Sequence, residues 1–143
     1  MDFNKIIRKI KQAIEKISDT SGYIWRTTEW NICHHIACGL SKEFVGLNVD
    51  VELRKEDLRR PDIVIHKRGN NEDNLVVFQV KKNPTTSKIK EDIEKIKETF
   101  FKDPYNYSYG IFVSVGELPK RLPDFDKNKI IIMQIYKGKI IIK

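Results

Sequence analysis

The sequence predicts a mixed α/β fold in a single domain, and three observations lead to this prediction. The chain has 143 residues, a length that suits one domain with its own hydrophobic core. Its apolar residues recur at helical spacing in some segments and at strand spacing in others. Hydrophobic residues make up 40% of the chain and charged residues 33%, which is ordinary for a globular protein. We find no internal repeat, low-complexity tract or linker in the sequence, so we assign residues 1 to 143 to one domain.

Two helices are predicted in the first third of the chain. Residues 1 to 20 contain apolar side chains at spacings of four and three, the pattern of an amphipathic helix, namely Phe3, Ile7, Ile10, Ile14 and Ile17. A second helix begins near Thr27 or Thr28, either of which is a suitable N-cap, and runs to about Phe44. Glu29 precedes Ile32 by three residues and so extends the apolar stripe of this helix, where a carboxylate is unusual.

Three strands are predicted in the middle of the chain. Residues 49 to 53 form the first and residues 62 to 66 the second. Residues 67 to 74 contain Gly and Asn in the combination that favours a turn. The third strand covers residues 75 to 81.

One helix and three strands are predicted in the remainder. The helix follows the third strand and has four apolar residues on one face, namely Ile89, Ile93, Ile96 and Phe100. Residues 109 to 115 read as a buried strand. Residues 130 to 136 and 139 to 142 flank Lys137-Gly138, which predicts a terminal hairpin within residues 129 to 143.

The second and third strands bring polar residues together. If they form a hairpin about the turn between them, Asp62 lies across from Gln79. Since side chains alternate along a strand, Gln79 and Lys81 share one face. Glu29 can approach the same edge from the second helix, and Glu52 in the first strand is another nearby acid.

These residue types suit a metal-dependent phosphodiesterase. Mg²⁺ and Mn²⁺ prefer oxygen ligands, usually one or two carboxylates with water and substrate phosphate. Asp62 would be the main ligand, Gln79 would offer a neutral carbonyl oxygen, and Glu29 would be a second ligand or hold water. Lys81 would orient the water and offset developing charge.

At these residues the sequence resembles the PD-(D/E)XK nuclease superfamily, which includes many restriction enzymes, junction resolvases and repair nucleases. Pro61-Asp62 matches the family's PD pair, and Gln79-Val80-Lys81 stands where its (D/E)XK tripeptide is expected. The element order over residues 27 to 115 matches the family's αβββαβ core. The chain looks closest to small stand-alone members whose Arg-Pro-Asp strand ends in a turn like His66-Lys67-Arg68-Gly69.

The resemblance implies a restriction endonuclease-like fold, with a mixed central sheet flanked by helices, an extra N-terminal helix and a C-terminal hairpin. It also implies a Mg²⁺- or Mn²⁺-dependent endonuclease in which Glu29, Asp62 and Lys81 form the site. Cutting two strands commonly takes two sites, so a homodimer through the first helix or the hairpin is also expected.

Position 79 departs from the family's pattern. Gln79 replaces the usual acid and removes a negative charge from the metal site, so metal affinity falls unless Glu29 or Glu52 compensates. Two other functions therefore stay open. One is a catalytically inactive nucleic-acid-binding or regulatory module on the same fold, and the other is a protein-interaction domain whose basic face is incidental.

The charge of the chain favours a polyanionic partner. The formal net charge is +7, which fits DNA, or RNA, as the ligand. Basic residues in or beside the two central strands and the third helix are the candidates for phosphate contacts, namely Arg59, Arg60, Lys67, Arg68, Lys82 and Lys88. The alternative is that these are solvated charges of a lysine-rich protein.

The remaining motifs have plainer interpretations. A zinc site from the helical group Cys33, His34, His35 and Cys38 is disfavoured, because these side chains cannot all face one ion on one helix. Three alternating tyrosines before the fourth strand favour packing over base stacking, namely Tyr105, Tyr107 and Tyr109. The first residues do not read as a signal peptide, and no apolar run reaches membrane-spanning length. The two cysteines lie close together in a helical segment, where a structural disulfide is not expected, so we expect a cytoplasmic protein.

Overall fold

The computed structural model describes residues 2 to 18, 22 to 52 and 60 to 143. Nine main elements follow one another in these ranges: α1 (Phe3–Ile17), α2 (Glu29–Glu43), β1 (Asn48–Val51), β2 (Ile63–His66), β3 (Val76–Lys82), α3 (Thr86–Lys95), β4 (Tyr109–Val115), β5 (Ile130–Tyr136) and β6 (Lys139–Ile142). A 3₁₀ helix, Tyr23–Arg26, precedes α2, and a π-helical turn, Ile96–Phe100, extends α3.

The predicted order of helices and strands is confirmed, and β4, β5 and β6 have the predicted bounds. The second helix is capped by Thr28, whose side-chain oxygen accepts from Asn31 N at 3.2 Å. The 3₁₀ helix was not expected from the sequence. The predicted end of the first strand, Leu53, and the predicted end of the first helix, residues 19 and 20, lie outside the described residues.

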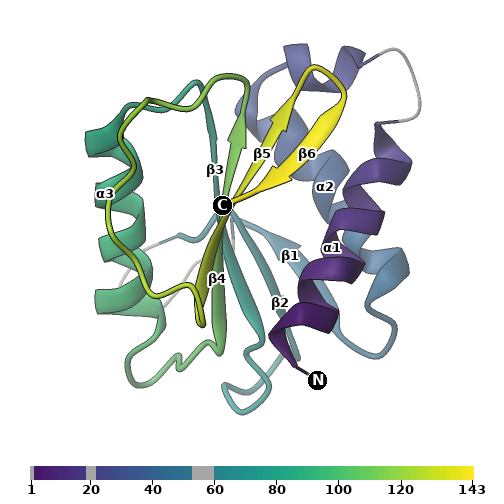
Figure 1. The fold of residues 1–143 in the computed structure, drawn as a ribbon. Coiled ribbons are helices and arrows are strands. Elements are labelled where there is room, and N and C mark those ends of the chain that lie inside the picture. Colours follow the sequence, from purple (N-terminus) through teal and green to yellow (C-terminus); the bar gives the residue numbers. More distant parts are fainter. Residues whose placement is uncertain (1, 19–21, 53–59) are drawn as a thin grey trace.

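The strands of the described chain form one mixed sheet in the order β1-β2-β3-β4-β5-β6. β1, β2 and β3 run antiparallel, β3, β4 and β5 run parallel, and β6 returns antiparallel to β5. A parallel pair needs a long crossover between its strands, and α3 provides the crossover from β3 to β4. This crossover places α3 on one face of the sheet, and α1 and α2 cover the other face (Figure 1).

The predicted hairpin of β2 and β3 is confirmed, together with its register. Ile63 pairs with Phe78, and Ile65 with Val76. Asp62 comes immediately before the first of these pairs, and its backbone N donates to Phe78 O at 3.2 Å. Asp62 therefore lies beside Gln79, as the sequence predicted.

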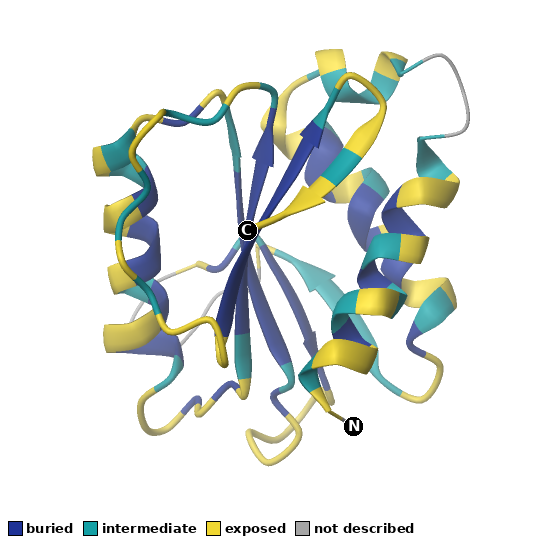
Figure 2. Ribbon diagram, viewed as in Figure 1, coloured by how far each residue is buried: buried dark blue, intermediate teal, exposed yellow. Residues whose placement is uncertain are grey.

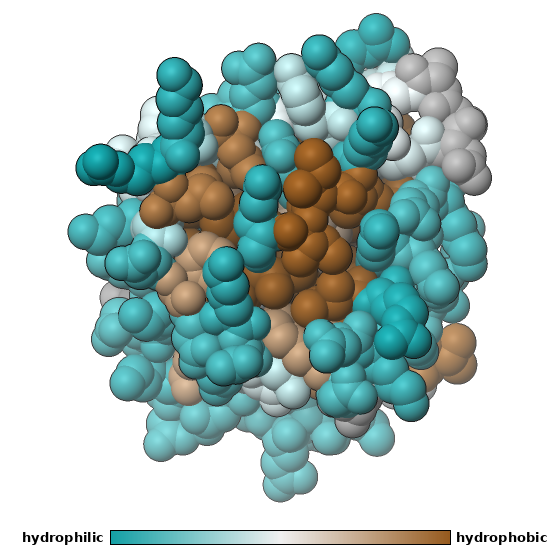
Figure 3. All heavy atoms as spheres, in the orientation of Figure 1, coloured by the Kyte–Doolittle hydropathy of each residue, from teal (hydrophilic) through white to brown (hydrophobic). Residues whose placement is uncertain are grey.

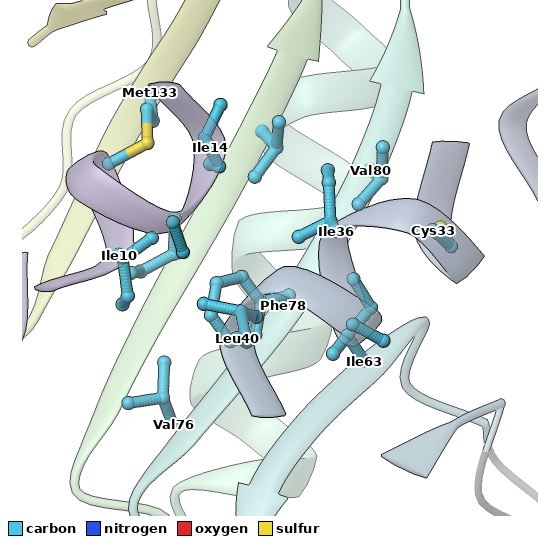
Figure 4. Packing of buried hydrophobic residues seen from close by; sticks show 14 of the residues in the cluster. Ile10, Ile14, Cys33, Ile36, Leu40, Ile63, Val76, Phe78, Val80 and Met133 are labelled. Carbon is cyan, nitrogen blue, oxygen red and sulfur yellow. The ribbon is translucent and has the colours of Figure 1, made fainter. Parts of the chain in front are cut away.

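The two faces of β3 pack against different helices. Val76, Phe78 and Val80 belong to the core under α1 and α2, which Figure 4 shows from close by. Val77 belongs to a second apolar cluster, under α3. Because side chains alternate along a strand, Gln79 lies on the α3 side with Val77, and Lys81 follows it there. Figure 2 shows how each helix turns a buried side to the sheet and an exposed side to solvent.

The C-terminal hairpin carries apolar side chains on the surface. Ile141 and Ile142 are 39% and 40% exposed on β6, which is an edge strand of the sheet. The space-filling view shows hydrophobic atoms gathered on the face where the C-terminal strands lie (Figure 3). Among the helices of the described residues, none has the length and apolar character that would let it cross a membrane.

Candidate active site

Asp62 lies where β2 begins, and its carboxylate is bound into the sheet. Asp62 Oδ2 accepts a hydrogen bond from Val80 N at 2.7 Å, and its backbone O accepts from Glu52 N at 2.9 Å. Burial raises the pKa of the Asp62 carboxyl above its ordinary value, although the Val80 hydrogen bond and the charge of Lys81 act in the opposite direction. The carboxylate is thus fixed in place but is poorly solvated.

Gln79 is almost fully buried next to Asp62. Its side chain is 1% exposed, and within the described residues nothing hydrogen-bonds its Nε2 atom. A buried polar atom without a hydrogen bond is costly and needs an explanation. The oxygen and nitrogen of a glutamine amide exchange places when the group turns over, so either atom can occupy the unpartnered position.

Lys81 extends from the same face of β3 toward α3. Its Nζ lies 3.9 Å from Asp92 Oδ2. Its positive charge lowers the pKa of Asp62 and of Asp92. Burial has the stronger effect on both carboxyls, so both pKa values are raised overall. Lys81 therefore interacts electrostatically with both carboxylates, and its direct contact is with Asp92, not with the predicted partner Asp62.

Asp92 is the residue of this site that sequence reasoning missed. It lies on α3, is 3% exposed, and its Oδ2 has no hydrogen-bond partner among the described residues. Lys88 Nζ, one helical turn earlier, is 3.9 Å from Asp92 Oδ1. Burial raises the pKa of the Asp92 carboxyl, and repulsion from Asp62 contributes to the rise. Its burial could have been inferred from the sequence, because Asp92 stands three residues after Ile89, on the apolar side of the helix.

Glu29 lies at the first position of α2, on the other face of the sheet. The expectation that Glu29 extends the buried stripe of this helix is wrong, because the residue is exposed. Glu29 Oε2 accepts from the backbone N of Lys82, the last residue of β3, at 3.1 Å. An acid in the first turn also complements the helix dipole. The negative charge of Glu29 raises the pKa of Asp62, by less than burial does.

The thiol of Cys33 is buried and is influenced by several charged residues. Cys33 lies on α2 in the core, and burial is the main reason that its pKa rises to about 12. Repulsion from Asp62, Glu29 and Glu52 raises this pKa further, while Lys81 lowers it. Burial and these acids both disfavour the thiolate form of Cys33.

The predicted phosphate-binding residues divide between the two ends of β2. Arg60 and Lys82 lie at the end that carries Asp62, where Lys82 Nζ donates to Thr27 O at 2.8 Å. Lys88, also near this end, contacts Glu91 Oε1 at 3.3 Å. Lys67 and Arg68 follow the opposite end of the strand, after His66. Arg59 falls outside the described residues.

Arg68 differs from the others because an acid already holds its guanidinium. Arg68 Nη2 and Nε donate to the two oxygens of Asp50 at 2.6 and 3.0 Å. His66 Nε2 lies 2.7 Å from the same carboxylate. This bidentate pair leaves less of the Arg68 charge for a phosphate than the exposed Lys67 has.

The other motifs singled out from the sequence are parts of the packing. Tyr105 and Tyr107 are buried under α3, and Tyr109 stacks on Phe3 with ring centroids 4.2 Å apart, so the preference for packing is confirmed. Cys33 is buried and Cys38 is exposed, and both are free thiols.

The donors at the site are oxygen atoms. Among the described residues, no three side chains of the His, Cys, Asp and Glu types gather in a way that would hold a metal ion. Asp62, Asp92 and Gln79 offer two carboxylates and one amide, a set that suits a hard divalent cation whose remaining ligands are water and phosphate. The unpartnered atoms of Gln79 and Asp92 are consistent with such a ligand.

We compared the chain with models of protein families, with curated proteins and with solved structures, and found no match in any of the three.

Proposed function

We propose that this protein is a Mg²⁺- or Mn²⁺-dependent nuclease that hydrolyses phosphodiester bonds in DNA. One observation carries the proposal: on the face of the sheet that α3 covers, Lys81 Nζ lies 3.9 Å from Asp92 Oδ2, a buried atom that accepts no hydrogen bond within the described residues. Gln79, with an unpartnered buried atom of its own, lies on the same face of β3 as Lys81, and Asp62 acts electrostatically on Asp92. Unsatisfied buried acids and amides beside a lysine are typical of a site completed by a ligand.

The proposal includes a restriction endonuclease-like core. In support, α2, β1, β2, β3, α3 and β4 follow one another in the order αβββαβ, with an antiparallel meander and then a parallel crossover. The resemblance of Pro61-Asp62 and Gln79-Val80-Lys81 to the PD-(D/E)XK pattern falls on adjacent strands of that core.

Each residue of the site has a role in this proposal. A bound divalent cation would supply phosphoryl polarisation and a water of lowered pKa. Asp62 and Gln79 would hold the cation with side-chain oxygens. The ammonium of Lys81 would stabilise negative charge that develops on the phosphate. Glu29, with one oxygen bound to Lys82 N, would hold a water or a second cation with the other.

The substrate class follows from charge. The chain carries a net charge of +7, and lysines surround the site, with Lys95 and Lys88 acting on Asp92 from α3. Such a surface binds a phosphate backbone and releases counterions when it does so. We include a homodimer in the proposal, since Ile141 and Ile142 expose apolar surface on an edge strand. The free thiols of Cys33 and Cys38 favour a reducing, cytoplasmic setting.

Cleavage of supercoiled plasmid and of single-stranded DNA with Mg²⁺ or Mn²⁺ tests the proposal, with RNA as a parallel substrate. We expect Asp62→Ala and Lys81→Ala to abolish cleavage. Lys97→Ala and Glu94→Ala, which change exposed charges on the α3 segment, should leave it intact. Cleavage that survives in both Asp62→Ala and Lys81→Ala would overturn the assignment.

A second candidate, a non-catalytic nucleic-acid-binding module, is favoured by one observation, the neutral Gln79 at a position where the family has an acid. Gel shifts over a salt series separate the two. Salt-dependent binding without cleavage in either metal would support the module. Binding whose affinity does not change with salt would count against phosphate contacts in both cases.

A further inference from the structure

We propose that Asp92 supplies the second carboxylate of the metal site, in place of the acid that position 79 lacks. This inference rests on the proposed function, and it assigns a ligand to a residue outside the PD-(D/E)XK pattern. Asp92 comes from α3, whereas the residues of that pattern lie on the β2–β3 hairpin and on α2.

The first observation behind it is the state of the Asp92 carboxylate. The residue is 3% exposed, and the two lysines nearest to its oxygens, Lys81 and Lys88, are both 3.9 Å away. That separation is beyond hydrogen-bond distance. A buried carboxylate normally needs close donors or a metal to offset the loss of hydration. These lysines offset part of its charge but leave Oδ2 free to bind.

The second observation is independent of the first and concerns Gln79. Gln79 is only 1% exposed, and its Nε2 has no hydrogen bond within the described residues. Turned over, the amide presents its carbonyl oxygen at the unpartnered position. Gln79 and Asp92 thus each bring an unsatisfied buried atom to the same side of the sheet.

Charge accounts for the choice of Asp92 over the other acids. An acid at position 79 would give the site two carboxylates together with Asp62. Gln79 reduces that number to one, and in the proposal Asp92 restores it from α3, where its Oδ2 lies 3.9 Å from Lys81 Nζ on the face of the sheet that carries Gln79. Glu29 is less suitable, since it is exposed and its Oε2 is bound to Lys82 N.

The competing role for Asp92 is to position Lys81 without touching the metal. The two roles predict different responses to an acid at position 79. If Asp92 is a ligand, Gln79→Glu should make it dispensable for metal binding, because the carboxylate number returns to two. If Asp92 only positions Lys81, its loss leaves metal affinity unchanged and Gln79→Glu has nothing to restore.

The experiment is a Mn²⁺ titration of the purified protein without DNA. Binding is measured by calorimetry and by the electron paramagnetic resonance signal of free Mn²⁺. We expect Asp92→Asn to weaken Mn²⁺ binding by at least the roughly 10–100-fold that the loss of an outer-shell partner of a metal ligand costs. The double variant Gln79→Glu/Asp92→Asn should recover most of that loss. Glu94→Gln removes one charge from an exposed position of the same helix and should change affinity by less than about twofold.

The possible failures are distinguishable. If Asp62→Asn weakens Mn²⁺ binding and Asp92→Asn does not, the inference is wrong while the proposed function stands. A loss in Asp92→Asn that Gln79→Glu does not restore also overturns it, because the number of carboxylates would then not determine the metal affinity. Wild-type protein that binds no Mn²⁺ overturns the inference and the metal-dependent function together.

A measurement on the wild-type protein does not depend on how the variants fold. Substoichiometric Mn²⁺ broadens carboxyl ¹³C resonances close to it. We expect the resonances of Asp62 and Asp92 to broaden together, while that of Glu94 stays sharp. A sharp Asp92 resonance beside a broadened Asp62 resonance would exclude Asp92 as a ligand.

Discussion

Two polar clusters lie at opposite ends of β2, and they differ in whether their hydrogen bonds are complete. The Asp50 cluster consists of Asp50, His66 and Arg68. Its carboxylate is held by three contacts of 2.6 to 3.0 Å from the guanidinium and the imidazole. These hydrogen bonds, from Arg68 above all, lower the pKa of Asp50 to about 2. Nothing further is needed to satisfy this cluster.

The Asp62 cluster consists of Asp62, Gln79, Lys81 and Asp92. Its lysine–carboxylate contact is 3.9 Å, Gln79 Nε2 and Asp92 Oδ2 have no hydrogen bonds within the described residues, and burial raises the pKa of both acids. The same kinds of side chain thus form a closed network at one end of the strand and an open one at the other. A closed network stabilises the fold, whereas an open one costs stability and persists where a ligand completes it.

The largest expected difference between the clusters is in catalysis. If the proposed function holds, Lys81→Met should lower DNA cleavage by roughly 10²–10³-fold, because it removes the charge that we propose stabilises the developing charge on the phosphate. Arg68→Met should leave the rate at saturating DNA within about threefold, since Arg68 is committed to Asp50. Single-turnover cleavage by the two variants measures both effects. Equal losses would mean that the Asp50 cluster also takes part in the reaction.

Much of the Asp62 cluster could be predicted because strands impose strict geometry. Centring the hairpin on the polar residues between β2 and β3 gave the register, and the alternation of Val76, Phe78 and Val80 with Gln79 and Lys81 gave the faces. These two rules act within one hairpin and need no knowledge of the rest of the fold.

The parts that the sequence did not reveal depend on packing between distant elements. Asp92 enters the cluster only because α3 lies against the sheet beside Lys81. Arg68 was expected to be available to phosphate, but its pairing with Asp50 depends on the side chains of neighbouring strands. The exposure of Glu29 follows from where the end of α2 lies relative to the sheet. Periodicity within a single element determines none of these.

The next effect is on stability, where the Asp50 cluster should dominate. Asp50→Asn should lower the free energy of unfolding at pH 7 by about 1–2 kcal/mol, because it removes charge-assisted hydrogen bonds of a half-buried carboxylate. Since the pKa of Asp50 is lowered on folding from 3.8 to about 2, its contribution is complete above pH 3.8 and is lost as the pH falls toward 2. Urea unfolding of both proteins over this pH range measures the difference, which should vanish at the acid end. A constant difference would contradict the pKa shift.

The open cluster should respond in the opposite direction. In metal-free protein, Asp92→Asn should leave the free energy of unfolding unchanged or raise it by up to about 1 kcal/mol. The reason is that the raised pKa of Asp92 means that the folded state disfavours its charged form. Chemical denaturation in the presence of a chelator measures this effect. A loss as large as that in Asp50→Asn would show that the contacts with Lys81 and Lys88 are structural.

The smallest expected difference is in the salt dependence of DNA binding. Each lysine that contacts a phosphate contributes about 0.9 to the slope of log affinity against log salt concentration. Lys67→Ala should therefore reduce the slope by nearly that amount if Lys67 binds the backbone, because the residue is exposed. Arg68→Ala should reduce it by less, since its guanidinium is already neutralised by Asp50 at 2.6 Å. Gel shifts at four or more salt concentrations, with DNA of fixed length, measure both slopes. A larger reduction for Arg68→Ala than for Lys67→Ala would mean that DNA separates Arg68 from Asp50 and that the closed cluster opens on binding.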